Sequence, residues 1–306
     1  MRASSFPKSM QWPPLPDLDC FVAPDDHSFA FKGFLDCNWL QALEVGIDPA
    51  HASFLHRFFQ DTDTAEGYGQ QFRAPTADAT IPVTKVLREY PCPTIEVEPA
   101  PHGLRIFALR DLDDGRKHVR ITNLLFPNAI VIPMSDEMII TQWHVPIDDE
   151  TCWWYAIFSS YRDPVDKAAM RAQRLDLYDV PSYRPRLNRA NGYGFDAEEQ
   201  KRATYTGMGM DINVHDQWAV ESPGSIQDRT IEHLGTSDRA ITANRKLLFR
   251  TMDALAAHAA EPVPPDAPLR GPVAIDTITP LDTWRDDWKA HDRARREASA
   301  WAADPW

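Results

Sequence analysis

The sequence predicts an α+β fold built on one antiparallel sheet. Between residues 94 and 160, six runs rich in Val, Ile, Thr, Phe and Trp are separated by turn-forming strings such as Pro-His-Gly and Asp-Asp-Gly. Short turns join antiparallel neighbours, whereas a parallel sheet would need a crossover helix between each pair of strands. Helical patterns lie before and after this block. The predicted strands are 94–98, 104–110, 118–124, 129–134, 138–146 and 152–160.

Composition limits the classes of function. The 306 residues are 43% hydrophobic and carry a net charge of -13, which argues against a nucleic-acid partner because phosphate binding requires a basic face. The N-terminus lacks the apolar core of a signal peptide, and no run of about 18 apolar residues occurs, so we expect a cytoplasmic protein without a membrane partner. Four scattered cysteines predict ordinary thiols rather than a disulfide framework or a zinc knuckle.

The segments before the sheet begin with a proline-containing arm. Pro13, Pro14, Pro16 and Pro24 predict that residues 1–30 are extended. A helix follows over residues 36–59, distorted near Pro49, and residues 61–69 predict a surface loop.

The segments after the sheet alternate between helices and turns. Residues 163–178 predict an amphipathic helix, residues 188–194 a turn-rich passage and residues 237–260 a long helix. The tail, residues 261–306, starts with a proline-rich extended stretch and ends in a helix over 282–303, whose tryptophans we expect to dock on the body of the domain.

The most informative stretch is residues 37–59, where Asp48, His51 and His56 lie among apolar side chains. On a regular helix, His51 and His56 would point about 140° apart, so one metal ion could not bind both. A shared site therefore requires either a π-type turn or a helix that ends before His56. The alternative is two unrelated histidines.

The wider string decides between these alternatives. The pattern Asn-Trp-x-Gln-x-x-Glu-x-x-x-Asp-x-x-His-x-Ser-x-Leu-His over residues 38–56 resembles the mononuclear-iron motif of Rieske-type aromatic-ring-hydroxylating oxygenases, most closely the phthalate dioxygenase-like branch of their α subunits. Residues 206–241 resemble the second signature of that branch. The resemblance implies a START-like helix-grip fold, a curved antiparallel sheet that grips a long helix, here residues 237–260 across its concave face.

The same resemblance implies a ligand set for mononuclear Fe(II): two histidines, here His51 and His56, and a distant carboxylate. Four aspartates compete for the third position: Asp211, Asp216, Asp228 and Asp238. We choose Asp216, because the family's ligand lies at the head of a helix with an aliphatic residue and then Glu behind it. Asp228 is the alternative.

Other polar residues receive supporting roles from the resemblance. Asn38 matches an amide close to the iron, and Asp48 matches an acidic residue that hydrogen-bonds a motif histidine and takes part in electron transfer between subunits. His215, adjacent to Asp216, is expected beside the site or in solvent rather than on the metal. The pattern around His144 leaves open whether this side chain faces the pocket or the core.

A Rieske [2Fe-2S] cluster is expected from another domain or chain. Its signature, C-x-H followed by C-x-x-H, does not occur in this sequence. We therefore divide the chain into an interdomain arm, 1–30, a mononuclear iron catalytic domain, 31–260, and a tail, 261–306. The chain would be either the catalytic part of a longer protein or a unit that receives electrons from a cluster on another polypeptide.

The function implied is that of an oxidoreductase, a non-haem iron monooxygenase or dioxygenase. It would hydroxylate or O-demethylate a small aromatic compound, with an aromatic carboxylate as one option, using O2 and electrons from NAD(P)H through a reductase and the Rieske donor, in a homotrimer or hexamer. Two rival interpretations remain: a zinc-dependent hydrolase, and a START-like carrier of apolar ligands with a vestigial metal site. Four arginines could bind a substrate carboxylate: Arg73, Arg105, Arg116 and Arg120.

Overall fold

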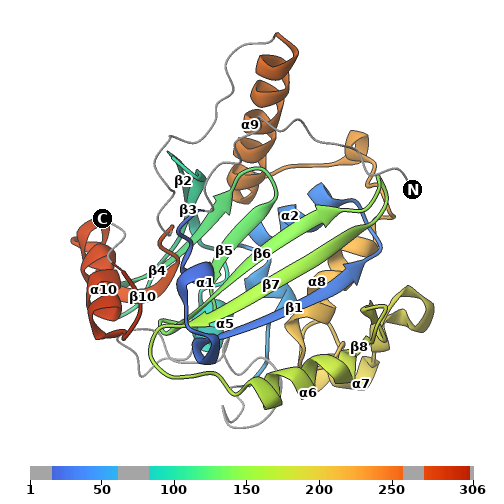
Figure 1. Cartoon of the computed structure of the whole chain (residues 1–306), viewed down its shortest axis with the longest axis horizontal. Helices are drawn as coiled ribbons and strands as arrows, with labels where there is room; N and C mark the ends of the chain where they lie inside the picture. Colours follow the sequence, from blue (N-terminus) through green and yellow to red (C-terminus); the bar gives the residue numbers. More distant parts are fainter. Residues whose placement is uncertain (1–15, 61–82, 258–271, 304–306) are drawn as a thin grey trace, which may run out of the picture.

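The computed structural model describes residues 16–60, 83–257 and 272–303. Within these ranges a large antiparallel sheet has the strand order β1-β7-β6-β5-β4-β3-β2, and β10 pairs with β4 beside β5 (Figure 1). The strands are β1 (Ser28–Leu35), β2 (Thr94–Ala100), β3 (Gly103–Asp111), β4 (Arg116–Leu125), β5 (Ala129–Pro133), β6 (Met138–Pro146), β7 (Cys152–Ser160) and β10 (Ile275–Pro280), with a separate hairpin of β8 (Tyr178–Asp179) and β9 (Arg184–Pro185).

The helices precede, follow and cover this sheet. They are α1 (Asp19–Val22), α2 (Trp39–Ile47), α3 (Ala52–Leu55), α5 (Val83–Glu89), α6 (Lys167–Leu177), α7 (Ala197–Arg202), α8 (Ile212–Glu221), α9 (Arg239–Ala256) and α10 (Trp284–Ala298). Short 3-10 turns occur at Asp25–His27, Arg189–Gly194, Arg229–Ile231 and Thr236–Asp238. No helix in the described ranges is both long enough and apolar enough to span a membrane.

The predicted fold class is confirmed, and the predicted meander is present strand by strand. All six runs between 94 and 160 form strands that pair with their sequence neighbours, and two of them, Met138–Pro146 and Cys152–Ser160, have the predicted bounds. Two further strands of the large sheet were not predicted, nor was the hairpin of β8 and β9. β1 pairs with β7, and β10, from the predicted extended tail, pairs with β4.

The predicted helix over 36–59 is interrupted, and the interruption has a local cause. Asp48 precedes Pro49, and a residue before proline is disfavoured in the α region. Asp48 accordingly takes an extended conformation, with φ -89° and ψ 105°, and ends α2. The chain then makes a turn before the short helix α3, which ends at Leu55. Of the two alternatives considered, a helix that ends before His56 is the one observed.

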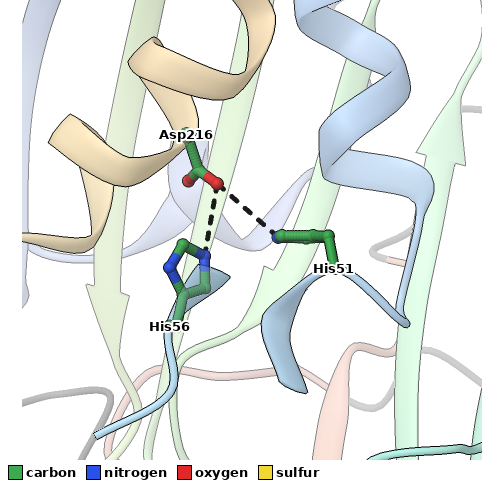
Figure 2. A group of neighbouring side chains, drawn as sticks. All are labelled: His51, His56 and Asp216. Carbon is green, nitrogen blue, oxygen red and sulfur yellow. Dashed lines mark ion pairs between the residues drawn. The ribbon is translucent and has the colours of Figure 1, made fainter. Parts of the chain in front are cut away.

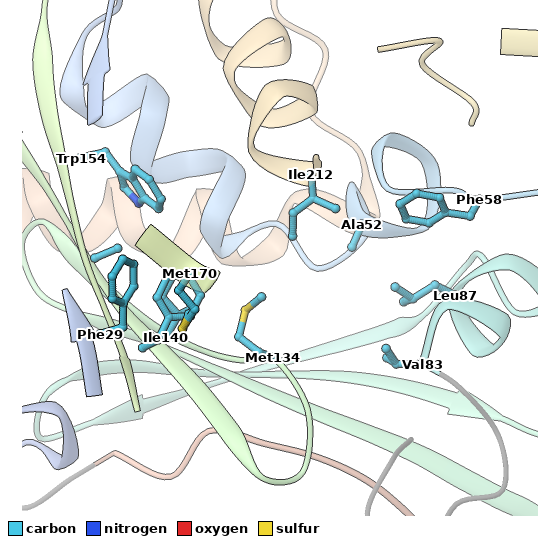
Figure 3. Close-up of a cluster of buried hydrophobic side chains, with 12 residues drawn as sticks. Phe29, Ala52, Phe58, Val83, Leu87, Met134, Ile140, Trp154, Met170 and Ile212 are labelled. Carbon is cyan, nitrogen blue, oxygen red and sulfur yellow. The ribbon is translucent and has the colours of Figure 1, made fainter. Parts of the chain in front are cut away.

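Helices α2, α3 and α8 place the motif on one face of the sheet. α2 contacts β4, β5 and β6, and α8 packs against α2 and α3. Ala52 of α3 and Ile212 of α8 belong to an apolar cluster with Met134 and Ile140 of the sheet side (Figure 3). This buried cluster fixes the segment that carries His51 and His56 relative to the helix that carries Asp216.

The long helix α9 lies elsewhere than expected. Its first turn packs beside β2, where Ala240 and Ile241 join a buried cluster with Leu43 and Ile95. Its later part extends away from the sheet (Figure 1), and Phe249 is 65% exposed. The helix that lies across the sheet is therefore α2, not α9.

The ends of the chain also differ from the simplest expectation. Residues 16–30 are not wholly extended, because α1 and a 3-10 turn lie within them. The predicted helix over 282–303 is found as α10, and Trp284 and Trp288 are buried against Phe107 of β3. The predicted loop 61–69 and Arg73 lie outside the described residues.

The close contact of α2 with β5 generates a test of this packing. A Cβ added to Gly46 would lie 2.1 Å from Cδ1 of Ile130. Alanine favours a helix over glycine by about 1 kcal/mol, but overpacking typically costs about 1–3 kcal/mol. We expect Gly46→Ala to lower the free energy of unfolding measured by denaturant titration.

The double variant provides the control. Ile130→Val removes the clashing methyl group, so Gly46→Ala in that background should be close to neutral or stabilising. An equal cost in both backgrounds would contradict the contact.

Candidate metal centre

Two side chains from the ends of α3 and one from α8, distant in the sequence, converge at one point. Nε2 of His51 lies 3.6 Å and Nε2 of His56 lies 3.2 Å from the same oxygen, Oδ1 of Asp216 (Figure 2). The three donor atoms all lie within 4.8 Å of one another, and within the described ranges these residues form the one cluster with such a geometry. His56 is buried, whereas His51 and Asp216 keep partial access to solvent.

The ends of α3 explain how the two histidines meet. His51 is the N-cap residue of α3, and His56 is its C-cap residue with non-helical φ -98° and ψ 26°. Because the helix ends between them, the two rings are not forced to opposite sides. Their centroids lie 5.1 Å apart at an interplanar angle of 86°. Asp216 lies in the middle of α8 rather than at its head, and it faces this pair.

The hydrogen bond at His51 indicates which ring nitrogen carries the proton. Nδ1 of His51 contacts the backbone carbonyl oxygen of Asp48 at short range. Since a carbonyl oxygen only accepts, Nδ1 donates, and in the neutral ring Nε2 carries a lone pair. That lone pair points at the Asp216 carboxylate, so two acceptors face each other. A cation between them would remove this repulsion.

The protonation states of His51 and Asp216 favour the binding of a cation. Burial lowers the pKa of His51, which keeps its imidazole neutral. Burial by itself would raise the pKa of Asp216, but attraction to His56 and His51 in their protonated forms outweighs it, and the net shift is downward. Neutral imidazoles and an ionised carboxylate are the forms that ligate metals. Ligands on bonds of about 2.1 Å lie about 3 Å apart at right angles, close to the separations found here.

Several other polar residues of the motif fix the position of α2. Gln41 donates to the carbonyl oxygen of Gly224, and its Oε1 accepts from the backbone of Gln227, which ties α2 to the segment after α8. Glu44 binds Arg245 of α9 through two contacts of 2.7 and 2.9 Å and also binds Arg229. These residues secure α2 and do not take part in the convergence of the ligands.

Asn38 also has a structural role, at the start of α2. Its Oδ1 accepts from the backbone of Leu40 at 3.0 Å, so it caps the start of α2, and its Nδ2 donates to Asp149. Asn38 thus lies at the start of α2 and Asp48 at its end, and the role of Asn38 near a metal stays a prediction.

Asp48 and His215 lie beside the triad. The carboxylate of Asp48 accepts from the backbone amides of Ala50 and His51, so the backbone carbonyl of Asp48, rather than its carboxylate, holds the His51 ring. His215 is buried, its Nε2 lies 2.9 Å from the carbonyl oxygen of Gly209, and its ring stacks on His56. His215 is therefore a neighbour of the site and does not face solvent.

The competing aspartates have other partners. Asp211 is the N-cap of α8, Asp228 is exposed and accepts from Thr230, and Asp238 accepts from Gly235. Arg229 pairs with Glu44 and Glu232 rather than with its neighbour Asp228. Among the four, Asp216 is the one that faces both histidines.

A largely apolar cavity of about 100 Å³ opens beside the triad. Most of the side chains around it are apolar, among them Trp154 and Phe158 of β7 and Ile140 of β6. His144 also lines the cavity and is 4% exposed, and neither ring nitrogen has a hydrogen-bond partner. The sequence left the direction of this side chain open, and the strand register places it opposite Trp154 on the cavity side.

The fold and this cluster define a class: an α+β domain in which two histidines and one aspartate converge at the wall of an apolar cavity. The chain belongs to the LigXa C-terminal domain-like family, whose profile matches residues 18–303. It corresponds to the catalytic domain of Rieske-type oxygenase α subunits, as the sequence resemblance implied.

Two relatives illustrate this membership. The oxygenase subunit of phthalate 4,5-dioxygenase from Pseudomonas putida is 31% identical over 256 residues, which are 78% of this chain and 53% of the relative. The oxygenase subunit of 5,5'-dehydrodivanillate O-demethylase from Sphingobium sp. (strain NBRC 103272 / SYK-6) is 26% identical over 274 residues, 89% of this chain and 53% of the relative. The chain thus spans about half the length of these relatives.

A solved structure of dicamba monooxygenase bound to 3,6-dichlorosalicylic acid overlaps more loosely. It is 14% identical, with a TM-score of 0.40 over 79% of this chain and 64% of that chain. An overlap of this size adds nothing to the fold seen in the strands themselves.

The buried position of His144 predicts a pH dependence of stability. Burial lowers the pKa of His144 to about 4, below the ordinary value of 6.5. Between these values the unfolded chain binds more protons, so stability is lost as the pH falls below about 6.5. For such a shift we expect about 2 kcal/mol to be lost between pH 7 and pH 5.

The matched variant is His144→Gln, which keeps a polar side chain but does not titrate. Denaturant titrations of both metal-free proteins should show a smaller loss between pH 7 and pH 5 for the variant. Equal losses would mean that His144 is accessible to protons in the folded state.

Proposed function

We propose that this chain holds mononuclear Fe(II) through His51, His56 and Asp216 and is the catalytic domain of a Rieske-type ring-hydroxylating or O-demethylating oxygenase. The observation that carries the proposal is the convergence of two Nε2 atoms and one carboxylate oxygen beside a cavity of apolar side chains. Three ligands on one face of a metal leave positions for oxygen, which is the arrangement of the non-haem Fe(II) oxygenases.

The residues of the chain have distinct tasks in this proposal. Bound iron would supply oxygen activation. The backbone carbonyl of Asp48 fixes the ring of His51 and raises the basicity of its Nε2, as a hydrogen-bonded partner does for ligating histidines. Trp154 and Phe158 exclude water and offer flat apolar surfaces to an aromatic substrate. His144, with no partner of its own, offers the substrate a hydrogen bond beside these rings.

Electrons would come from outside the described residues. We propose a Rieske [2Fe-2S] donor on another domain or chain, reduced by NAD(P)H through a reductase, with Asp48 beside the electron path. The division into arm, catalytic domain and tail, and the homotrimer or hexamer in which one subunit's cluster serves another's iron, belong to the same proposal. The relatives are named for phthalate and for dehydrodivanillate, which supports an aromatic substrate.

Metal binding tests the assignment without turnover. Anaerobic titration with Fe(II), followed by nitric oxide, should give one equivalent of a high-spin iron–nitrosyl signal in electron paramagnetic resonance. His51→Ala and Asp216→Ala should reduce the iron affinity at least tenfold, since each removes a ligand. Asp228→Ala is the matched control, because this exposed aspartate caps a surface turn, and it should leave the affinity unchanged.

Other outcomes would favour the rival functions. Preferential zinc binding with hydrolytic activity would support a zinc-dependent hydrolase. Binding of an apolar ligand that is indifferent to His51→Ala, together with no iron binding, would support a carrier. Equal iron binding by wild type and Asp216→Ala would contradict the assigned ligand set.

A further inference from the structure

Tyr178, the first residue of β8, brings a hydroxyl group to the cavity from outside the motif. It lines the cavity and is 6% exposed. Its ring packs on Phe31 of β1, with the ring centroids 5.2 Å apart. The hairpin that carries it lies along the edge strand β1, where the backbone amide of Phe34 donates to the carbonyl oxygen of Tyr183 at 2.9 Å. Contacts with the sheet edge therefore set the position of Tyr178.

A glycine in β1 leaves the space that the ring of Tyr178 fills. A Cβ added to Gly33 would lie 2.7 Å from Cε1 and 3.1 Å from the hydroxyl oxygen of Tyr178, so a larger residue at position 33 would displace this end of the ring. Gly33 pairs with Trp154 of β7, whose side chain lines the cavity. Because paired residues of neighbouring strands face the same side of a sheet, the hydroxyl group lies on the side of Trp154.

The hydroxyl group of Tyr178 has no hydrogen-bond partner among the described residues. Buried tyrosine hydroxyls usually have one, and a buried donor without an acceptor costs free energy. Burial raises the pKa of Tyr178, so the hydroxyl group stays protonated and can donate. A ligand with an acceptor atom at this position would gain a hydrogen bond, whereas an apolar ligand of the same shape would leave the donor unpaired.

Charged groups of the cavity wall already have partners within the protein. Nη1 of Arg120 donates to Oδ2 of Asp276 at 2.5 Å. Asp48 accepts from two backbone amides, and Asp216 faces the histidines. The unused donor at Tyr178 is uncharged, so a neutral acceptor can bind it without bringing a charge into the apolar cavity.

We propose that Tyr178 is a specificity-determining residue, whose hydroxyl group donates a hydrogen bond to a neutral oxygen or nitrogen atom of the ligand, and that Gly33 makes room for it. The inference rests on the proposed function in taking this cavity as the ligand site. It adds that ligands with a neutral acceptor bind in preference to apolar ligands of the same shape.

His144 is a second candidate donor in the same row of the sheet. Trp154 pairs with Gly33 on one side and with His144 on the other, so the Cα atoms of Gly33 and His144 lie two strand spacings, roughly 10 Å, apart. Neither ring nitrogen of His144 has a partner. A small ligand with one acceptor atom can bind only one of these two groups, so variants at the two positions distinguish them.

The test compares benzonitrile, whose nitrogen accepts a hydrogen bond, with phenylacetylene, which has nearly the same shape and lacks this acceptor. Binding of each is measured by isothermal titration calorimetry on the iron-loaded chain under anaerobic conditions. Tyr178→Phe removes only the hydroxyl oxygen. We expect it to raise the Kd for benzonitrile about fivefold, as for the loss of one neutral hydrogen bond, and to change the Kd for phenylacetylene less than about twofold.

The nitrile stretch reports the contact directly, because its infrared frequency rises when the nitrogen accepts a hydrogen bond. Bound benzonitrile should absorb at a higher frequency in wild type than in Tyr178→Phe. Tyr183→Phe is the matched control, since this tyrosine lies in the same hairpin and also contacts Phe31 but does not line the cavity. It should change neither the affinities nor the frequency.

Gly33→Ala tests the position of the hydroxyl group independently. It keeps Tyr178 but displaces the end of its ring, so the preference for benzonitrile should fall as in Tyr178→Phe. The double variant should show no further loss, because both changes remove the same contact. Thermal melting checks the folding of each variant, and if Gly33→Ala does not fold, Tyr178→Phe decides, since it leaves the packed ring in place.

The nitrile nitrogen could instead bind the iron, so both measurements are repeated on the metal-free chain. A Tyr178-dependent frequency shift without iron supports the inference, even where the chain binds no iron and the oxygenase proposal fails. A shift that requires iron and is equal in Tyr178→Phe would overturn the inference and leave the oxygenase proposal standing. A shift lost in His144→Leu but kept in Tyr178→Phe, or no binding of benzonitrile by wild type, would also contradict it.

Discussion

The candidate site depends on one backbone constraint, the interruption of the helix between α2 and α3 and its end at Leu55. A continuous helix would separate the rings of His51 and His56 by about 140°. The proline at position 49 forces Asp48 out of the helical region, and the chain restarts as a single turn bounded by the two histidines. Both histidines are thus end residues of α3, where the backbone can direct their rings toward one point.

Contacts made by the rest of the motif hold the short helix α3 in position. One turn of helix has little stability of its own, so its position must come from tertiary contacts. Ala52 is buried in the cluster with Ile212, and Ser53 accepts a hydrogen bond from Arg110. Gln41 and Glu44 fix α2 to the segments that follow α8. The spacing of the motif therefore reflects contacts that fix α2 and α3 as much as the proposed ligation, and repulsion between the acceptor atoms of His51 and Asp216 would couple metal binding to folding.

The parts of the fold that could be predicted from the sequence are those set by interactions between residues close together in the chain. The strands between 94 and 160 pair with their sequence neighbours, so composition and turns were enough to place them. β1 and β10 pair with strands more than a hundred residues away, and nothing local in Ser28–Leu35 or Ile275–Pro280 names those partners. α9 was predicted over 237–260 and is found at Arg239–Ala256, but its amphipathic pattern could not specify that its N-terminal part packs beside β2 while its later part extends away from the sheet.

The same distinction between local and long-range interactions applies to the candidate site. Local rules identified His51 and His56 as a pair that needs a broken helix, and the resemblance, not the geometry, selected Asp216 over Asp228. The sequence could not show that Asp276 reaches Arg120, because β10 brings the two together from 156 residues apart. That long-range pair has a physical consequence for the fold. Breaking a buried pair of this kind leaves an uncompensated charge in the interior, so the pair ties the C-terminal strand β10 to β4 through an interaction that no local pattern in the sequence specifies.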